Sequence, residues 1–550
     1  MDKKNLSETN IHNSKQSFVK RLLLLLLCNS IVFLILAIWG PIRFETIDDI
    51  WMLLFASGSY SGTPDPHLVF INYLYGFVVS SLYKIYDGIE WYTVLFILIH
   101  IVSLTVITWK VLISTASTIH KIVYISLFVI FEAYFILYFQ FTTTAAICAL
   151  CSIVIFSSSE KILSIIISIF FFTLASLIRL ESAFVVMAIS SPLILYTLYR
   201  FYKKRLYVNI LLSVLFLLLP IISQIINNRI YDNDEKWRIY KEYNSYRGKI
   251  NDNPNNKLIT QENLPSGVYM SDYELLLYSC PDTKVFSNSA IKEISDQLKE
   301  IPVKNKFKNI IPNIWGHRKS ILILLTATLL LFFTIKEKRY KPILILSFLI
   351  YILLLLYISL DATLKGRVFM TAVIPLWWIF FLSEKDQKYE KKHQLIIYAL
   401  LAGGLLFFFG RLDVRYRIEA RHYRKIYLSE QSRLFNHLES TDKYIIPFED
   451  ALQFRSAPPL RISDTYAQNN VLALAWLTKI PFNEGKLETY TDLIEKKMFA
   501  YKHHYPDAKK YLTNSILLHY NIKVEFIILM ETSNFILFKI IPSESEQYSI

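Results

Sequence analysis

Apolar residues gather along this chain in runs long enough to cross a lipid bilayer. A helix needs about twenty consecutive apolar residues to span the hydrocarbon core. Inside that core, only a helix can satisfy all the backbone polar groups of such a run. The pattern therefore predicts an all-α polytopic membrane protein with about 11–13 transmembrane helices. Twelve runs are recognised: 22–40, 68–86, 91–109, 122–139, 142–157, 162–178, 183–199, 206–226, 319–335, 342–360, 368–383 and 394–410.

The composition supports this class, because 53% of the 550 residues are hydrophobic and the mean hydropathy is +0.35. The net charge of +14 could indicate nucleic-acid binding. The basic residues, however, lie in short segments between apolar runs, as they do in the cytoplasmic loops of membrane proteins. No nucleic-acid partner is therefore expected. Four basic clusters are assigned to the cytoplasm: Lys3–Arg21, Arg200–Arg205, Lys336–Lys341 and Lys385–Lys392.

This assignment sets the predicted domain organisation. Residues 1–21 form a cytoplasmic N-terminus. Residues 22–410 form a transmembrane domain with exterior loops at 41–67 and 228–318, and residues 411–550 form an exterior soluble α/β domain.

The count of runs conflicts with this organisation. A cytoplasmic N-terminus and an exterior tail require an odd number of crossings, but twelve runs are present. One run between 68 and 199 must therefore be split, merged or re-entrant. The basic segment Lys110–Lys121 shows the same conflict, since strict alternation places it outside.

The exterior segments carry patterns of ordered structure. Residues 490–520 are helix-like, and the strand-like segments VEFIILME and FILFKIIP, joined at Thr532–Asn534, predict a β-hairpin. Some side chains of the exterior loop could stack on sugar rings, although anchoring in the membrane interface is the favoured explanation: Trp237, Tyr240, Tyr243 and Arg247.

The stretch RFETIDDIWM follows the first apolar run and places Glu45, Asp48 and Asp49 where the first span ends. Single loop carboxylates are usually just solvated. Here, however, the adjacent acids open the segment IWMLLFASGSYSG, which is apolar enough to lie in the membrane interface as a juxtamembrane helix. The next span is entered through GTPDPHLVFIN, which brings further polar side chains to the same boundary: Asp65, His67 and Asn72.

These features resemble the GT-C superfamily of polytopic glycosyltransferases, which includes protein mannosyltransferases and aminoarabinose transferases. The resemblance lies in the acidic pair of the first exterior loop, the juxtamembrane helix, the prolines Pro64 and Pro66 before the second span, and the exterior C-terminal domain. It implies transfer of a sugar from a polyprenyl-phosphate donor to an exterior acceptor, with a first-loop acid as the base. Asp48 is the better match to that acid.

The chemistry also requires a carboxylate, because the acceptor hydroxyl must lose its proton as the anomeric carbon is attacked. Asp48 is predicted to be the base, and Asp49 to modulate its pKa or bind the acceptor. No metal or other cofactor is expected, because an acid pair without further exterior ligands is a poor divalent site.

The leaving lipid phosphate needs cationic partners at the membrane boundary. SLIRLES places Arg179 and Glu181 at an exterior turn, and DATLKGRVF places Lys365 and Arg367 at another. An ion pair between Arg179 and Glu181 that only closes the turn is an equal alternative. With Glu45, Asp65, His67 and Asn72, these residues form the predicted substrate site. For His67 a role as a helix cap or interface residue is the favoured alternative, and for Lys365 and Arg367 a solvated loop is slightly favoured.

Two other classes of function remain open at this point. A polysaccharide polymerase or ligase also has many spans and a large exterior loop. A flippase would place ionisable residues within spans, and Glu132 is the main residue of that kind here. The favoured hypothesis is an integral glycosyltransferase of a bacterial plasma membrane that modifies a glycan, lipid or protein. The sugar and the acceptor are left open.

Overall fold

The computed structural model describes residues 19–35, 42–300, 340–361, 364–384, 429–430, 433, 445–448, 459–460 and 472–543. Several sequence predictions fall outside these residues: the runs 319–335 and 394–410, and the basic segments 3–18, 336–339 and 385–392.

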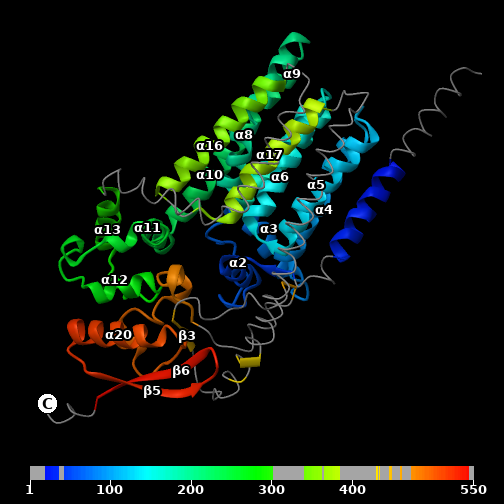
Figure 1. Cartoon of the computed structure of the whole chain (residues 1–550). Helices are drawn as coiled ribbons and strands as arrows, with labels where there is room; N and C mark the ends of the chain where they lie inside the picture. The colour runs from blue at the N-terminus through cyan, green and yellow to red at the C-terminus, as the bar shows by residue number, and fades with distance from the viewer. Residues whose placement is uncertain are drawn as a thin grey trace, which may run out of the picture.

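The larger part of the molecule is a bundle of long helices (Figure 1). In the described part of the chain, seven helical stretches are long and apolar enough to cross a membrane. A shorter apolar helix, α7 (Ile162–Ile178), lies among them, and residues 19–35 are also helical. The predicted polytopic class is confirmed. The seven stretches are α4 (Trp91–Leu112), α5 (Thr118–Leu137), α6 (Phe141–Ser158), α8 (Leu180–Lys203), α9 with α10 (Tyr207–Ser213 and Leu215–Asn233), α16 (Tyr340–Asp361) and α17 (Gly366–Glu384).

Helix α6 lies at the centre of the bundle and packs against α4, α7, α8 and α17. Every side chain from Phe141 to Ser157 is buried. The sequence FTTTAAICALCSIVIFSS is rich in Thr, Ala, Ser and Cys, whose small side chains allow helices to approach closely. The position of α6 therefore depends on contacts around its whole circumference.

Helix α3 (Tyr73–Ile85) does not cross the bundle, which corrects the prediction that run 68–86 is a span. Its 13 residues extend only about 20 Å, less than the roughly 30 Å of a bilayer core. Its first turn lies beside α10, where the Asn72 amide donates to the carbonyl of Ser223. Its last turn lies beside the start of α4, where Tyr83 donates to Glu90. Without run 68–86, eleven predicted crossings remain, two of which lie outside the described residues. An odd number of crossings agrees with the predicted placement of the two ends of the chain.

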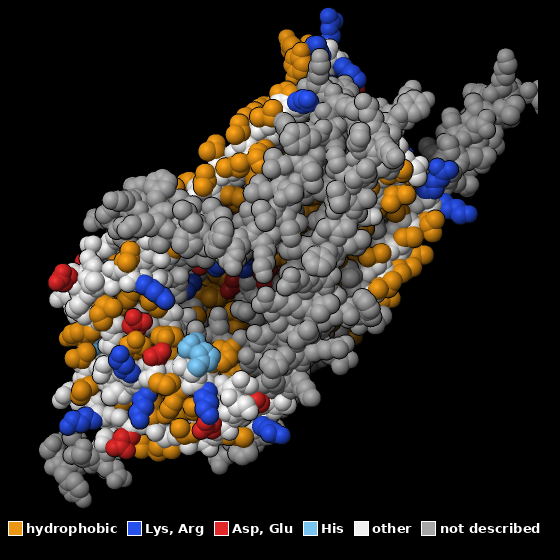
Figure 2. Space-filling model, viewed as in Figure 1, with side chains coloured by type: hydrophobic (Ala, Val, Ile, Leu, Met, Phe, Trp, Pro, Cys, Tyr) orange, Lys and Arg blue, Asp and Glu red, His pale blue; other side chains and the backbone are white. Residues whose placement is uncertain are grey.

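The same correction moves the segment Lys110–Lys121 to the other end of the bundle. Lys110 lies within electrostatic reach of Lys161, between α6 and α7. Close by in the chain, Glu160 pairs with Arg200 and Lys204 at the end of α8. Figure 2 shows apolar side chains along the bundle and basic ones at its tip near α9. The basic loops that the structure describes are thus gathered at one end, as cytoplasmic loops would be.

At the opposite end, a second part of the molecule is built from the loop after α10 and from the C-terminal residues (Figure 1). It holds the segments that the sequence predicts to be exterior and is called the exterior part for that reason; its side of the membrane stays a prediction. The loop forms α11 (Glu235–Asn251), α12 (Met270–Leu277) and α13 (Asn288–Glu300). The C-terminal residues form a sheet of order β3-β4-β6-β5, in which β3 and β4 are parallel and the other pairs antiparallel. Its elements are β3 (Ile445–Pro447), β4 (Lys497–Tyr501), β5 (Val524–Glu531) and β6 (Phe535–Pro542), with α20 (Tyr505–Tyr520) against them.

The predicted hairpin is confirmed, because β5 and β6 pair antiparallel across Thr532–Asn534. The prediction of one helix-like stretch over 490–520 is wrong in its first half. Residues 497–501 are strand β4, and the helix begins only at Tyr505. KMFAY pairs with both β3 and β6, so tertiary pairing decided the structure of a segment with no strong local preference.

Helix α2 (Ile47–Ser57) lies buried between the bundle and the exterior sheet, and is not an interfacial helix as the sequence suggested. Alternate residues of each strand point to opposite faces of a sheet. Phe499 of β4, with Phe535 and Leu537 of β6, shares a core with α2, whereas Met498 and Phe538 pack with α20. Residues 47 and 49–56 of α2 are all buried. The acidic segment is therefore fixed from both sides.

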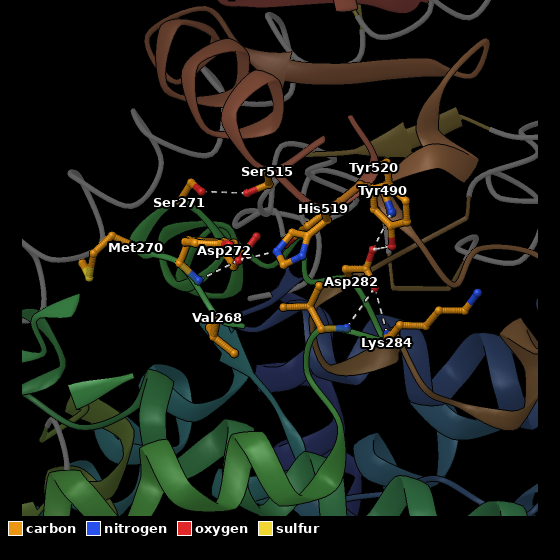
Figure 3. A network of polar contacts seen from close by, with 12 residues as sticks. Val268, Met270, Ser271, Asp272, Asp282, Lys284, Tyr490, Ser515, His519 and Tyr520 are labelled. Carbon is orange, nitrogen blue, oxygen red and sulfur yellow. Dashed lines mark hydrogen bonds and ion pairs between the residues drawn. The ribbon is translucent and has the colours of Figure 1, made fainter. Parts of the chain in front are cut away.

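Polar contacts to two buried carboxylates join the two halves of the exterior part (Figure 3). His519 of α20 contacts Asp272 of α12 at 2.8 Å. Asp282 accepts from the hydroxyl of Tyr520 at 2.6 Å and from the backbone of Tyr490 at 2.7 Å. Because both carboxylates are almost completely buried, these partners are needed to offset their desolvation.

Candidate functional site

The acidic pair begins α2, and its two members have different surroundings. Asp49 is fully buried. Its Oδ1 accepts from the Tyr92 hydroxyl at 2.9 Å and from the Phe141 backbone at 3.0 Å. Its Oδ2 accepts from the hydroxyl of Thr46 at 3.0 Å. Asp49 thus connects α2 to the first turns of α4 and α6.

Burial raises the pKa of Asp49 from its ordinary 3.8 to about 8, although three hydrogen bonds oppose the shift. The nearby charge of Asp48 acts in the same direction as burial. A carboxyl that is mostly protonated near pH 7 and has no open face is a poor base. Asp49 is therefore suited to holding the segment in place.

Asp48 is half-buried, and no hydrogen bond or ion pair holds its carboxylate within the described residues. It lies within electrostatic reach of Asp49, Tyr92 and Tyr240. Asp48 is thus the accessible acid of the pair.

Glu45 precedes α2 and is held by the turn between α5 and α6. Its backbone N–H donates to the carbonyl of Phe139 at 3.0 Å, and its carboxylate accepts from the side chain of Gln140. The short strands β1 (Arg43–Phe44) and β2 (Tyr138–Phe139) pair at the same place. Glu45 therefore has a structural partner for its carboxylate.

A cavity of about 890 Å³ lies where the bundle meets the exterior part. Its membrane side is formed by the end of α7 and the start of α8, and its exterior side by α11 and α13. Figure 2 shows a hollow at this level with acidic and basic side chains at its edge. Two buried hydroxyls in the lining, those of Tyr240 and Ser295, have no hydrogen-bond partner within the described residues. Such groups are costly unless a ligand or water satisfies them.

Arg179 is the single residue between α7 and α8, and it lines this cavity. Its Nε pairs with Glu181 at 3.0 Å, and its Nη1 donates to the carbonyl of Phe70 at 3.3 Å. Its guanidinium carbon lies 5.2 Å from the centre of the Phe141 ring. The predicted ion pair with Glu181 is present, but Glu181 is mostly exposed, so the pair contributes little to stability.

The start of α8 also faces the cavity, with no side chain capping its free N–H groups. A helix N-terminus favours an anion, because its unpaired N–H groups carry partial positive charge.

Sequence reasoning missed three lysines that line the cavity: Lys241 and Lys249 of α11, and Lys299 of α13. A sequence pattern that could have pointed to this face of α11 is the spacing of four residues between Tyr240, Asn244 and Gly248, which places all three along the cavity. Trp237, Tyr240 and Tyr243 are buried, so they are not the interface anchors that the sequence favoured.

The second predicted cationic loop lies at the edge of this region. Lys365 pairs with Asp252 at 3.0 Å, and Asp252 lines the cavity. Arg367 is half-buried and does not line it. Asn72 lines the cavity, but its side chain already has partners. Its Oδ1 caps α3 by accepting from the backbone of Leu74, and its Nδ2 donates to the carbonyl of Ser223 in α10.

Asp65 and His67 form a close pair in the loop before α3. Oδ1 of Asp65 lies 2.8 Å from Nδ1 of His67 and accepts from the His67 backbone at the same distance. The imidazole stacks on Trp237 with ring centres 4.4 Å apart. It also lies edge-on to Tyr231, which lines the cavity. The carboxylate orients the ring, as in catalytic Asp–His pairs.

Val69 lies two residues further on, lines the cavity and has φ of 65°. A β-branched residue in this region is strained by roughly 1–3 kcal/mol, and such strain is concentrated at functional sites. Its N–H donates to the hydroxyl of Tyr231. The loop that carries His67 is thus held against the cavity in a strained form.

No protein-family model matches the chain, and no curated protein matches it. Among solved structures, the crystal structure of ArnT from Cupriavidus metallidurans bound to undecaprenyl phosphate is similar in overall architecture. The match covers 94% of this chain and 98% of that chain, at 9% sequence identity and a TM-score of 0.40. Agreement at this level does not relate individual residues of the two proteins.

Proposed function

We propose that this protein is a membrane glycosyltransferase that moves a sugar from a polyprenyl-phosphate donor to an exterior acceptor. The observation that carries the proposal is that an accessible carboxylate lies close to residues that line or contact a cation-lined cavity, while Asp48 itself is not part of the lining. Phe141 binds Asp49, next to Asp48, and stacks under Arg179. Tyr240 lines the cavity within electrostatic reach of Asp48. Phe141 and Tyr240 thus connect the proposed base to the proposed anion site.

The cavity suits a lipid phosphate. Four basic residues line it against two acidic ones, Glu181 and Asp252, and the start of α8 adds unpaired N–H groups. Lys241 and Lys299 also pair with acids outside the lining, Asp232 and Asp296. Charge-assisted hydrogen bonds to phosphate contribute about 1.5–3 kcal/mol each. The apolar residues Leu177, Ile178 and Leu180 line the membrane side, where the first isoprene units of the donor would lie. The basic residues are Arg179, Lys241, Lys249 and Lys299.

Asp48 is the proposed base, because it is the member of the pair that is open to an acceptor. In the transfer, the acceptor oxygen forms a bond to the anomeric carbon as the bond from that carbon to the phosphate oxygen breaks. The acceptor proton passes to Asp48, and the electron pair of the broken bond leaves with the phosphate. Glu45 and Asp49 hold the segment, and His67, oriented by Asp65, contacts the substrate.

The acidic end is proposed to face the exterior of a bacterial plasma membrane, with the basic loops and the N-terminus in the cytoplasm. The acceptor would be a cell-surface glycan, lipid or protein that approaches from that side. A polysaccharide polymerase or ligase, the alternative from the sequence, would not need Asp48.

Binding of polyprenyl phosphate to the purified protein in nanodiscs tests the donor site, with uncharged polyprenol as the control ligand. We expect binding of the phosphate only, weakened about tenfold in Arg179→Gln. Arg247→Gln is the matched control, because Arg247 is on α11 but does not line the cavity. Equal binding of phosphate and polyprenol would contradict the proposed donor.

A further inference from the structure

A polar group of three side chains is buried inside the helical bundle, away from the cavity. His100 of α4 lies with Nδ1 2.7 Å from Oε1 of Glu132 of α5. Its Nε2 lies 2.9 Å from the hydroxyl of Thr144 of α6. The side chains of His100 and Thr144 are fully buried and that of Glu132 nearly so. Burying a carboxylate within membrane-spanning helices costs free energy, and residues of this kind usually have a function.

The hydrogen-bond directions fix the charge of this group. The Thr144 hydroxyl lies 2.8 Å from the carbonyl of Gln140, which can only accept. The hydroxyl proton therefore points to that carbonyl, and the contact with His100 requires a proton on Nε2. The short contact from Nδ1 to Glu132 then needs one more proton, on either atom. His100 and Glu132 thus share one proton and carry no net charge.

The cost of burying a charge also indicates that His100 and Glu132 share one proton. Oε2 of Glu132 is buried with no partner within the described residues. A full negative charge on this carboxylate beside a neutral imidazole would be uncompensated inside the bundle, at a cost of several kcal/mol. A shared proton avoids that charge. This arrangement gives Glu132 a role other than ion passage through the membrane.

The group is connected to the acidic segment through the turn 138–141. Thr144 binds the carbonyl of Gln140, the Gln140 side chain binds Glu45, and the next backbone N–H, that of Phe141, binds Asp49. The contacts form one continuous path from the interior of the bundle to α2. A contact that fixes the position of the first turn of α6 therefore also fixes the positions of Glu45 and Asp49.

We propose that His100 and Glu132 are positioning residues for Asp48 and Asp49, acting as a neutral, proton-sharing pair that holds the start of α6. The catalytic part of this inference rests on the proposed function. The pair acts through Thr144 and Gln140 and does not touch substrate.

Two adjacent threonines provide a matched test. Thr143 and Thr144 are both buried and both donate to the carbonyl of Gln140, but only Thr144 contacts His100. Hydrogen–deuterium exchange of the peptide covering residues 43–49 reports the order of the acidic segment. We expect exchange about tenfold faster in Thr144→Val and within about twofold of wild type in Thr143→Val. Equal effects of the two variants would overturn the proposal.

The transfer reaction supplies a second readout. Thr144→Val should lower kcat about tenfold with KM within about twofold, because the acid is displaced while the donor cavity is intact. If wild type has no transferase activity but the exchange results hold, only the proposed function fails.

Substitutions of Glu132 test whether the group needs a charged carboxylate or only a partner for Nδ1 of His100. A Gln side chain donates N–H to Nδ1 and keeps the pair neutral, so Glu132→Gln should retain slow exchange of 43–49, whereas Glu132→Ala should lose it. ¹⁵N NMR of labelled histidine should show His100 protonated on Nε2 in wild type and in Glu132→Gln. Equal loss of order in the Gln and Ala variants, or an Nε2 without a proton, would overturn the neutral pair.

Discussion

The backbone N–H of Phe141 donates to Oδ1 of Asp49 over 3.0 Å, which ties the first turn of α6 to the first turn of α2. The ring of the same residue lies 5.2 Å from the guanidinium carbon of Arg179. One residue therefore sets the separation between the acidic segment and the cationic turn. A displacement of α6 would move the acids relative to the cavity.

Asp48→Asn should abolish most transfer activity and leave donor binding unchanged. Removing a positioned general base lowers a rate by about 10²- to 10⁴-fold. Asn is nearly the same size, so expression and membrane insertion should be normal. Initial rates of sugar transfer measure the effect. Asp87→Asn is the control, because Asp87 is an exposed acid in the loop between α3 and α4. Full activity in Asp48→Asn would exclude this residue as the base.

Asp49→Asn should lower transfer activity only slightly, and should change how the stability of the folded protein depends on pH. Because the folded pKa of about 8 lies above the ordinary 3.8, the folded protein binds this proton more tightly than the unfolded chain. The stabilising effect of that proton is fully present below pH 4 and is lost as pH rises towards 8. Asn copies the protonated form and does not titrate.

Thermal unfolding at two pH values measures this effect of the Asp49 proton on stability. We expect Asp49→Asn to unfold at a higher temperature than wild type at pH 8.5, with a smaller difference at pH 5. Asp87→Asn should follow wild type at both values. A wild-type protein as stable as Asp49→Asn at pH 8.5 would show that Asp49 is not held protonated.

Tyr240→Phe should weaken polyprenyl-phosphate binding without destabilising the free protein. The Tyr240 hydroxyl is buried, unpartnered within the described residues and part of the cavity lining. Removing it costs no protein hydrogen bond, but removes about 0.5–1.5 kcal/mol from a ligand that uses it. The ligand-induced shift in Tm measures the loss.

Tyr243→Phe is its matched control. The Tyr243 hydroxyl is also buried and unpartnered within the described residues, on the same helix, but it does not line the cavity. The same decrease in ligand-induced shift for both variants would mean that the cavity does not bind the donor through Tyr240.

Cysteine labelling tests whether α3 stays on the exterior side. Asp87 and Thr118 are exposed, in the loop after α3 and at the start of α5. With an impermeant thiol reagent on intact cells, Asp87→Cys should react, and Thr118→Cys should react only after permeabilisation. If α3 crossed the membrane, the two results would be exchanged.

The sequence by itself determined the features that depend on local pattern. Apolar runs of spanning length have one way to satisfy their backbone in lipid, so the bundle was predictable. The hairpin of β5 and β6 was predictable from two strand-like segments and a short turn. The turn between α7 and α8 was also predictable, because Arg179 interrupts two apolar runs.

Only the tertiary structure decided which polar groups are accessible. Asp48 and Asp49 are adjacent in the chain, but Tyr92 and Phe141, from two other helices, surround only one of them. Run 68–86 was apolar enough to be taken for a span, and its contacts at both ends keep it on one side. Burial and hydrogen bonding are set by residues distant in sequence, whereas periodicity reports only the nearest neighbours along the chain.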